Sequence, residues 1–250
     1  MSEEKNDQTE VREATSSDLF EMNLDQFLDE LSALNDTLPI QLMLLKLKHK
    51  QLIERLEKIS TSSEETDEEG VEFVRYKVNA EGVDEFPKIH KHLNRTDIAQ
   101  KIIPRNFIVS IISQYDAFLG NIVRALYDIN PNIIRSSEKE LNVEDLFNYK
   151  TIDELKEHII DKEVDSLLRE EHFEQFKILE RKISKVTDKN FTLTTNLPVL
   201  PKFIELTQRR NLFVHTNGQT TRQYLEAKKK WKFKSECNGD LNEELIASSD

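Results

Sequence analysis

The apolar side chains between residues 104 and 127 recur at helical spacing, and this pattern limits the fold more than any other feature. On an ideal helix they fill one wide arc, which is typical of a helix that packs against a core. They are Phe107, Ile108, Ile111, Ile112, Tyr115, Phe118, Leu119, Ile122, Val123 and Leu126. We expect the helix to begin at Pro104 and to end at DINPN, because Pro131 disfavours helical geometry at Asn130.

The composition points to the same fold class. Only 5 glycines and 6 prolines occur in 250 residues, of which 33% are charged. Helices need few glycines and prolines, so an all-α fold is expected. Amphipathic spacing predicts further helices over residues 152–168 and 172–183, and a last one that begins at Pro198 or Pro201 and ends at about residue 215. The alternation in VEFVRYKV, residues 71–78, predicts a short strand or one short β-ribbon.

An N-terminal helical hairpin or coiled-coil arm is predicted over residues 19–60. Residues 1–18 carry almost no large apolar side chains, so we expect a disordered tail there. From Phe20 the apolar residues alternate in steps of four and three, as in a coiled coil. Pro39 is expected to break this stripe into two helices. His49 lies in the seam and is expected to be partly buried.

A boundary is predicted after the arm. The run STSSEETDEEG combines small polar and acidic residues, so residues 61–70 are expected to form an acidic linker. A helical domain over residues 71–250 is expected to follow. The chain ends in Ser248, Ser249 and Asp250, residue types that begin helices, which leaves open that this domain is truncated at its C-terminus.

Charge and cysteine content exclude several classes of protein. A net charge of −12 argues against nonspecific coating of DNA or of a membrane, because such binding neutralises phosphates with basic residues. Cys237 is the only cysteine, which rules out an intrachain disulfide, and no zinc-binding spacing occurs. No apolar run reaches spanning length, and no signal segment is recognisable. We therefore expect a cytoplasmic protein without a membrane partner.

The segment QRRNLFVHTNG, residues 208–218, places charged and polar side chains in an apolar helix. On an ideal helix Arg210 points into the apolar arc, whereas Arg209 can face solvent. A guanidinium in that arc must be paired or line a cleft, because an unpaired buried charge is costly. Asp116 is a possible partner for Arg210.

The end of the same segment is expected to stop the helix. Asn211 and His215 are four residues apart and can contact each other. Asn217 or Gly218 can adopt the left-handed conformation that ends many helices. Geometry alone leaves two interpretations open. Arg210 is either a core residue in a salt bridge, with His215 as a helix cap, or part of a functional site.

The hexapeptide RNLFVH, residues 210–215, has the form Arg-polar-x3-His and resembles the signature of the HEPN superfamily, the higher eukaryotes and prokaryotes nucleotide-binding domain. Its context, QYDAFLGNIVRALYDINP followed by helical segments, is also similar to HEPN proteins of bacterial defence and toxin systems. The resemblance covers about residues 90–230 and leaves the N-terminal arm outside it.

This resemblance implies a HEPN-like helical bundle that forms a homodimer and cleaves RNA without a metal or other cofactor. His215 would be the general acid or base, Arg210 the ligand of the phosphate in the transition state, and Asn211 the residue that orients His215 or the phosphate. The reaction would give a 2′,3′-cyclic phosphate and a 5′-hydroxyl. A bacterial antiviral defence or toxin role and a cognate antitoxin or sensor protein are also implied.

The basic run KKKWKFK follows the motif and is the best local candidate for RNA binding. Lysines contact phosphates and aromatic rings can stack on bases. The candidate residues are Lys228, Lys229, Lys230, Trp231 and Lys232. A solvated helix end whose aromatic side chains pack inward is the alternative. For the whole protein, two alternatives to the endoribonuclease stay open, namely a noncatalytic HEPN-like module that binds RNA or protein, and a purely structural helical protein.

Overall fold

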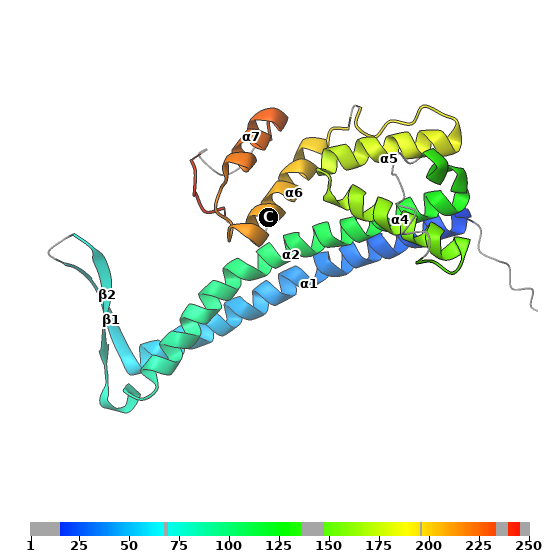
Figure 1. Cartoon of the computed structure of the whole chain (residues 1–250). Coiled ribbons are helices and arrows are strands. Elements are labelled where there is room, and N and C mark those ends of the chain that lie inside the picture. The colour runs from blue at the N-terminus through cyan, green and yellow to red at the C-terminus, as the bar shows by residue number, and fades with distance from the viewer. Residues whose placement is uncertain (1–15, 68–69, 137–147, 196, 234–239, 246–250) are drawn as a thin grey trace, which may run out of the picture. The chain divides into compact units, whose positions relative to one another are not determined.

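The computed structural model describes residues 16–67, 70–136, 148–195, 197–233 and 240–245 (Figure 1). Within these ranges the chain forms six α-helices and one β-hairpin. The helices are α1 (Ser16–Ile59), α2 (Phe86–Ile129), α4 (Ile152–Arg169), α5 (His172–Thr187), α6 (Leu200–His215) and α7 (Arg222–Trp231). The strands are β1 (Ser60–Thr66) and β2 (Glu72–Val78), and short 3-10 helices span Ala80–Gly82 and Pro131–Ser136. The predicted all-α fold with one β-ribbon is confirmed.

Two predictions concern residues outside the described ranges. The tail predicted over residues 1–18 lies outside them up to residue 15, but Ser16 already begins α1. The C-terminal residues 248–250, on which the predicted truncation rests, also lie outside. Within the described part of the chain, no helix is both long enough and apolar enough to span a membrane.

The described chain divides into two compact units. The first unit draws on residues 1–30 and 113–204, and the second on residues 31–112 and 205–250. Helices α1, α2 and α6 therefore contribute residues to both units. The predicted division follows sequence order, with an arm over residues 19–60 and a domain over residues 71–250. Each of the two compact units instead combines segments that are distant in sequence.

The first unit has the larger apolar core. Nine buried residues from α2, α4, α5 and the 3-10 helix after α2 form it, including Leu119, Val123, Ile160 and Leu179. The Thr151 side chain accepts a hydrogen bond from the Glu154 backbone N–H and caps α4, as residue type predicts. The helices predicted over residues 152–168 and 172–183 are thus confirmed within a few residues.

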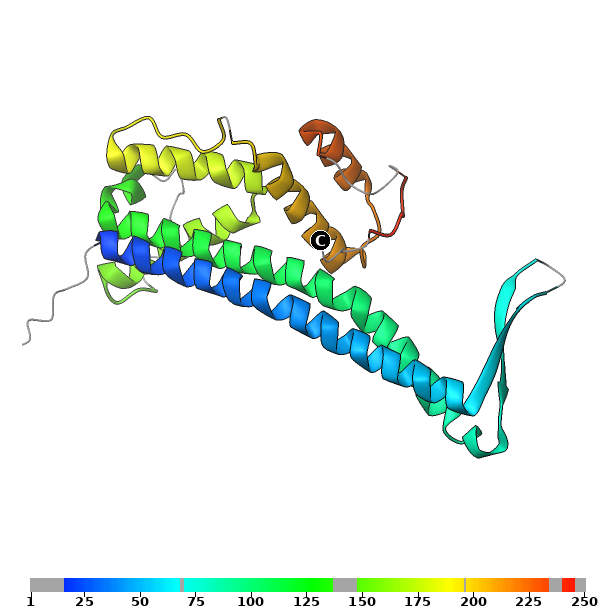
Figure 2. The same cartoon turned by 180° about the vertical axis from the view of Figure 1, so that it is seen from behind.

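Helices α1 and α2 lie side by side, and neither is broken at its proline (Figures 1 and 2). In the second unit, Leu52 and Leu56 of α1 pack with Ile89 and Leu93 of α2. In the first unit the rings of Phe27 and Phe118 stack with centroids 4.6 Å apart. The two helices are thus packed together on both sides of Pro39.

The predicted break at Pro39 and the predicted helix start at Pro104 are therefore wrong. Each proline removes one backbone hydrogen bond, but the apolar stripe continues on both sides of it and keeps the helix packed on its partner. Pro39 lies inside α1, and α2 begins at Phe86 and carries Pro104 in its interior. The arm is accordingly one long helix paired with α2 rather than a hairpin of its own. The predicted end of the helix before Pro131 is confirmed, since α2 ends at Ile129.

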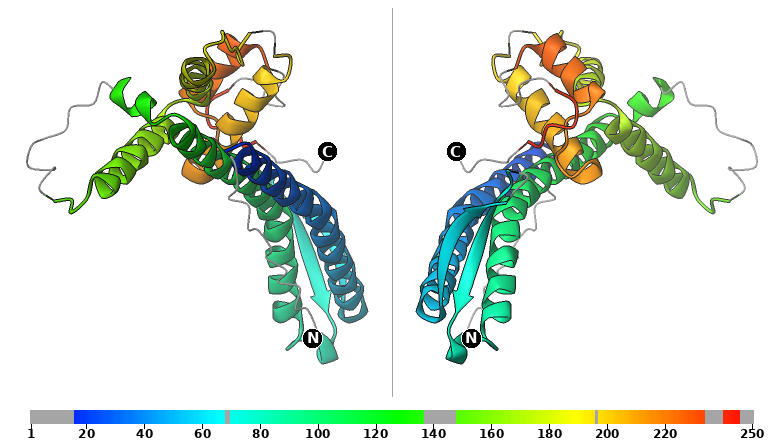
Figure 3. Two further views of the ribbon diagram at one scale, coloured as in Figure 1. Left: turned by 90° about the vertical axis from the view of Figure 1, so that its right-hand side faces the viewer. Right: turned by 90° about the vertical axis from the view of Figure 1, so that its left-hand side faces the viewer.

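The predicted acidic linker is also wrong over most of its length, because residues 60–66 form strand β1. They pair antiparallel with β2, from Ser60 opposite Val78 to Thr66 opposite Glu72, and the ribbon joins the end of α1 to the segment that leads into α2 (Figure 3). Most β1 side chains are exposed. Strand β1 is stabilised by backbone hydrogen bonds to β2, and polar side chains do not prevent such pairing. The strand predicted at residues 71–78 is confirmed as β2.

Candidate functional site

The motif residues lie on the second half of α6. His215 is the last residue of the helix, and its side chain is exposed, whereas Arg210 and Asn211 are half-buried. His215 is five positions after Arg210, which corresponds to about 7.5 Å along an ideal helix and about 140° around it. The two side chains therefore leave α6 on different sides.

The Arg210 guanidinium is held by its neighbour in sequence. Its Nη1 donates to Asn211 Oδ1 at 3.0 Å, while its Nε is buried and has no hydrogen-bond partner among the described residues. Within the described residues of its own unit, Arg210 pairs with no carboxylate. The contact expected between Asn211 and His215 is not formed, because the Asn211 oxygen accepts from Arg210 instead.

Arg209 differs from its expected exposure. Its side chain is only 14% exposed, and both Nε and Nη2 contact Glu205 Oε1, at 3.1 and 3.0 Å. The two residues are four apart on α6, a spacing at which opposite charges meet. Arg209 is therefore a half-buried partner of Glu205, and the expectation that it faces solvent is wrong.

Asp116, the predicted partner of Arg210, lies in the first unit. Its Oδ1 is 3.5 Å from His172 Nε2, beside the ring of Tyr115. Burial raises the pKa of the Tyr115 hydroxyl, and the Asp116 charge raises it further. His172 packs against Tyr115 and Phe203 and is mostly buried. The pairing of Asp116 with Arg210 stays a prediction.

The end of α6 adopts the predicted left-handed conformation. Both Asn217 and Gly218 have positive φ, of 53° and 87°. The backbone N–H groups of Thr216 and Gly218 donate to the Leu212 carbonyl at 2.9 and 3.0 Å. The helix thus ends directly after the histidine, with the carbonyls of its last turn partly satisfied.

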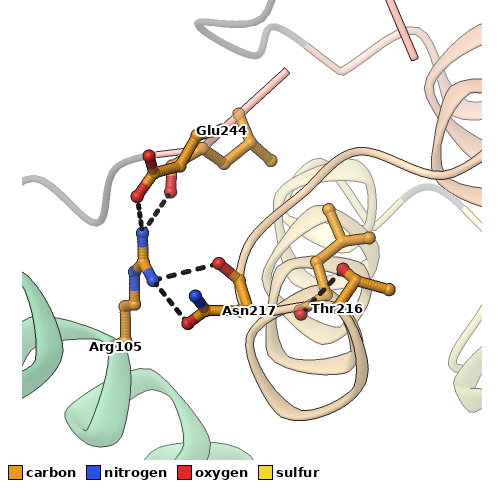
Figure 4. A network of polar contacts seen from close by, with 6 residues as sticks. Arg105, Thr216, Asn217 and Glu244 are labelled. Atoms are coloured by element: carbon orange, nitrogen blue, oxygen red, sulfur yellow. Dashed lines mark hydrogen bonds and ion pairs between the residues drawn. The ribbon is translucent and has the colours of Figure 1, made fainter. Parts of the chain in front are cut away.

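A second arginine, Arg105 of α2, fastens this helix end, and sequence reasoning missed it (Figure 4). Its Nη1 donates to the Asn217 carbonyl and to Asn217 Oδ1, both at 3.1 Å. Its Nη2 contacts Glu244 Oε1 at 2.6 Å and the Leu245 carbonyl at 3.4 Å. The Arg105 side chain is only 9% exposed. The guanidinium therefore joins three segments of the second unit two residues beyond His215.

The close approach of Arg105 depends on a glycine. A Cβ atom added to Gly218 would lie 3.2 Å from Arg105 Nη2 and 3.2 Å from the Leu245 carbonyl oxygen. Beyond it, the Thr220 N–H donates to the Glu243 carbonyl, and the Leu245 N–H donates to the Gly218 carbonyl. These contacts hold residues 240–245 against the turn that follows α6.

One pattern could have drawn attention to Arg105. It lies seven residues before Ile112, which is fully buried, so an ideal helix places both on one face. Because Pro104 was expected to begin the helix, Arg105 was assigned to its first turn. The direction of a side chain in the first turn does not predict whether that side chain is buried. Its partners lie more than a hundred residues further along the chain, and no local pattern identifies them.

The predicted RNA-binding residues lie at the end of α7, which packs beside the second half of α6 (Figure 2). Lys229, Lys230 and Lys232 are exposed, and Lys228 is half-buried. The ring of Trp231 packs against a small core formed by Leu212, Tyr224, Phe233 and Leu245. Because Phe233 is buried in this core, it is not available to stack on a base, in keeping with the inward-packing alternative. The Lys230 ammonium lies 5.5 Å from the Trp231 ring centroid.

This small core links the two candidate elements. Leu212 and Phe213 belong to the hexapeptide RNLFVH, and both pack in the same cluster as Trp231 and Phe233. The exposed lysines of α7 are thereby fixed to the helix that carries Arg210 and His215. Among the described residues, no three His, Cys, Asp or Glu side chains gather into a group that could bind a metal ion.

Comparisons of the chain with models of protein families, with curated proteins and with solved structures found no match.

Proposed function

We propose that the chain is a metal-independent endoribonuclease of HEPN type that acts in bacterial antiviral defence or as a toxin. One observation carries the proposal. The half-buried guanidinium of Arg210 pairs with no carboxylate among the described residues of its unit, and the same helix ends in an exposed histidine. A half-buried cation with spare donors and an exposed imidazole suit the binding and cleavage of a phosphodiester.

The proposed reaction is an attack of the ribose 2′-hydroxyl on the adjacent phosphorus. A histidine takes the 2′-OH proton, the new P–O bond forms, and the bond to the 5′-oxygen breaks. A second histidine donates a proton to that oxygen, which leaves as a 5′-hydroxyl, and the phosphate becomes a 2′,3′-cyclic diester. One α6 carries only one histidine of the motif, so a homodimer supplies the acid and the base.

In this proposal Arg210 stabilises the negative charge that grows on the phosphoryl oxygens. Asn211 orients Arg210, because its Oδ1 holds the Arg210 Nη1. His215, at the exposed end of α6, transfers the proton. The exposed Lys229, Lys230 and Lys232 form a local basic surface on an otherwise acidic chain, and in this proposal they bind the phosphates of the RNA backbone. A cytoplasmic location and control by an antitoxin or sensor protein complete the proposal.

A noncatalytic HEPN-like module that binds RNA or protein is the second candidate. The exposed apolar side chains of α1, which are suited to protein contact, favour it. This candidate needs no chemistry from His215. RNA or protein binding that survives the substitution of His215 by alanine would distinguish it from the endoribonuclease.

The test is cleavage of total RNA and of tRNA in EDTA by the unsubstituted protein and by the Arg210→Ala and His215→Ala variants. We expect the unsubstituted protein to produce fragments with 2′,3′-cyclic phosphate ends. Each variant should lose at least about 100-fold in rate, as expected when a transition-state donor or a proton-transfer group is removed. Arg124→Ala, at a surface ion pair of α2, is the matched control and should cleave normally. Absence of cleavage by the unsubstituted protein, or equal rates in all variants, would contradict the proposal.

A further inference from the structure

Helix α1 is apolar on two opposite sides in its middle part. Leu38, Leu42 and Leu45 are half-buried and continue the stripe that faces α2. On the other side, four large apolar residues are at least half exposed. They are Ile40 (54%), Met43 (54%), Leu44 (57%) and Leu47 (50%), and together they are called the outer patch below.

The outer patch forms one continuous surface. Its residues follow the spacing i, i+3, i+4 and i+7, which places them on one face over two helical turns. A helix with a single packed side normally carries polar residues on this face. Contiguous exposed apolar side chains of this kind mark interaction sites.

A shallow groove of about 550 Å³ runs along the edge of the outer patch. Its lining combines apolar residues, among them Leu38, Leu42 and Met43, with the polar Asn35, Lys46 and Lys50, all from α1. Such a depression can accept a side chain from a second helix, as in the packing of knobs into holes. The patch and groove together suit a helical occupant.

The charges that flank the patch identify the occupant. Asp36 lies one turn before Ile40, whereas Lys46, Lys48 and Lys50 lie at the other end of the patch, and all four side chains are exposed. An antiparallel second copy, related by a two-fold axis between Met43 and Leu44, sets Ile40 against Leu47. It also brings Asp36 of one copy close to Lys50 of the other. A parallel second copy would place like charges against each other.

We propose that the outer patch of α1 is a self-association surface, at which the α1 helices of two copies pair antiparallel. Two copies of the α1–α2 pair would then form a four-helix bundle. An anionic membrane is the competing occupant, because Lys46, Lys48 and Lys50 lie beside the patch, but the net charge of −12 of the whole chain opposes it. The inference does not rest on the proposed function, since Arg210 and His215 lie on α6.

The first test is sedimentation velocity of the whole chain over a range of concentrations, with and without Leu44→Glu. We expect concentration-dependent self-association that Leu44→Glu weakens by about 100-fold in dissociation constant, because the two-fold axis places a glutamate from each copy at the centre of the interface. A dimer formed through α6 would not respond to this substitution. Leu44 is exposed in the single chain, so the circular dichroism spectrum and the thermal midpoint should not change. Ile98→Glu, at a residue of α2 that is 55% exposed, is the matched control and should still dimerise.

Charge reversal tests the antiparallel arrangement. Asp36→Lys and Lys50→Asp should each weaken the dimer by about tenfold, and the double variant should regain most of the affinity. An oligomeric state that is the same with and without Leu44→Glu at every concentration, whether monomer or dimer, would overturn the proposal. Failure of the double variant to recover would overturn the antiparallel pairing. Flotation of a monomeric chain with phosphatidylserine vesicles, lost in Leu44→Glu, would assign the patch to a membrane and also overturn it.

Discussion

Arg105 and Arg210 are both buried to some degree in the second unit, yet their surroundings differ. The terminal nitrogens of Arg105 contact four acceptors, one of them the Glu244 carboxylate. Arg210 contacts one acceptor, the Asn211 side chain. The Nε atom lacks a hydrogen-bond partner in both, so the difference lies at the terminal nitrogens. A guanidinium with four acceptors holds segments of the fold together, whereas one with few acceptors can bind a ligand.

The largest expected effect on stability is that of Arg105→Ala. It leaves the Asn217 and Leu245 carbonyls without their donor and opens a space between α2 and the end of α6. We expect a loss of about 3 kcal/mol in the free energy of unfolding, because a mostly buried side chain and its hydrogen bonds to two backbone carbonyls are lost. Urea denaturation followed by circular dichroism measures it.

The control for this substitution is Arg124→Ala on the same helix. Arg124 and its partner Asp161 are 42% and 56% exposed, so this ion pair should contribute at most about 1 kcal/mol. If the two variants were equally stable, the structural role assigned to Arg105 would be wrong.

Gly218→Ala should have the next largest effect. Its φ of +87° already costs an alanine about 1 kcal/mol, and the added Cβ crowds Arg105 and the Leu245 carbonyl. We expect a loss of about 2 kcal/mol or more in the same urea experiment. Gly70→Ala is a matched control, because Gly70 has a φ of +83° and no atom within 4 Å of the added Cβ. It should lose only the backbone part, about 1 kcal/mol, and equal losses in both variants would show that the contact with Arg105 is unimportant.

Glu244→Gln should have a smaller effect. It keeps an oxygen that can accept from Arg105 Nη2 but removes the charge, and the Glu244 side chain is 51% exposed. We expect a loss of about 1 kcal/mol or less, because solvent screens the ion pair. The difference in unfolding free energy between Glu244→Gln and Glu244→Ala measures the hydrogen bond separately. A loss as large as that of Arg105→Ala would mean that the charge of Glu244 dominates the network.

The fold was predictable where local sequence signals decide it. Helices α4 and α5 and the end of α2 follow from periodicity, an N-cap threonine and a proline. The prediction was wrong at Pro39 and Pro104, where packing of α1 against α2 outweighs the missing backbone hydrogen bond. It was also wrong at Ser60–Thr66, because polar residues form a strand when β2 supplies the backbone partners.

The candidate site was predictable only in its local chemistry. The left-handed end of α6 at Asn217 and Gly218 depends on residue type and is confirmed. Arg210 is half-buried, as its position on the helical wheel indicates. The role of Arg105 depends on Asn217 and Glu244, which lie far along the chain, so only the tertiary structure reveals it.

We propose that Arg210 serves RNA cleavage, whereas Arg105 serves the fold. The most direct measurement is the cleavage rate of the Arg210→Ala variant in EDTA, at a temperature where its thermal melt shows it to be folded. We predict a thermal midpoint close to that of the unsubstituted protein, within about 0.5 kcal/mol in stability, and a rate at least about 100-fold lower. An unchanged rate, or a stability loss as large as that of Arg105→Ala, would contradict the claim.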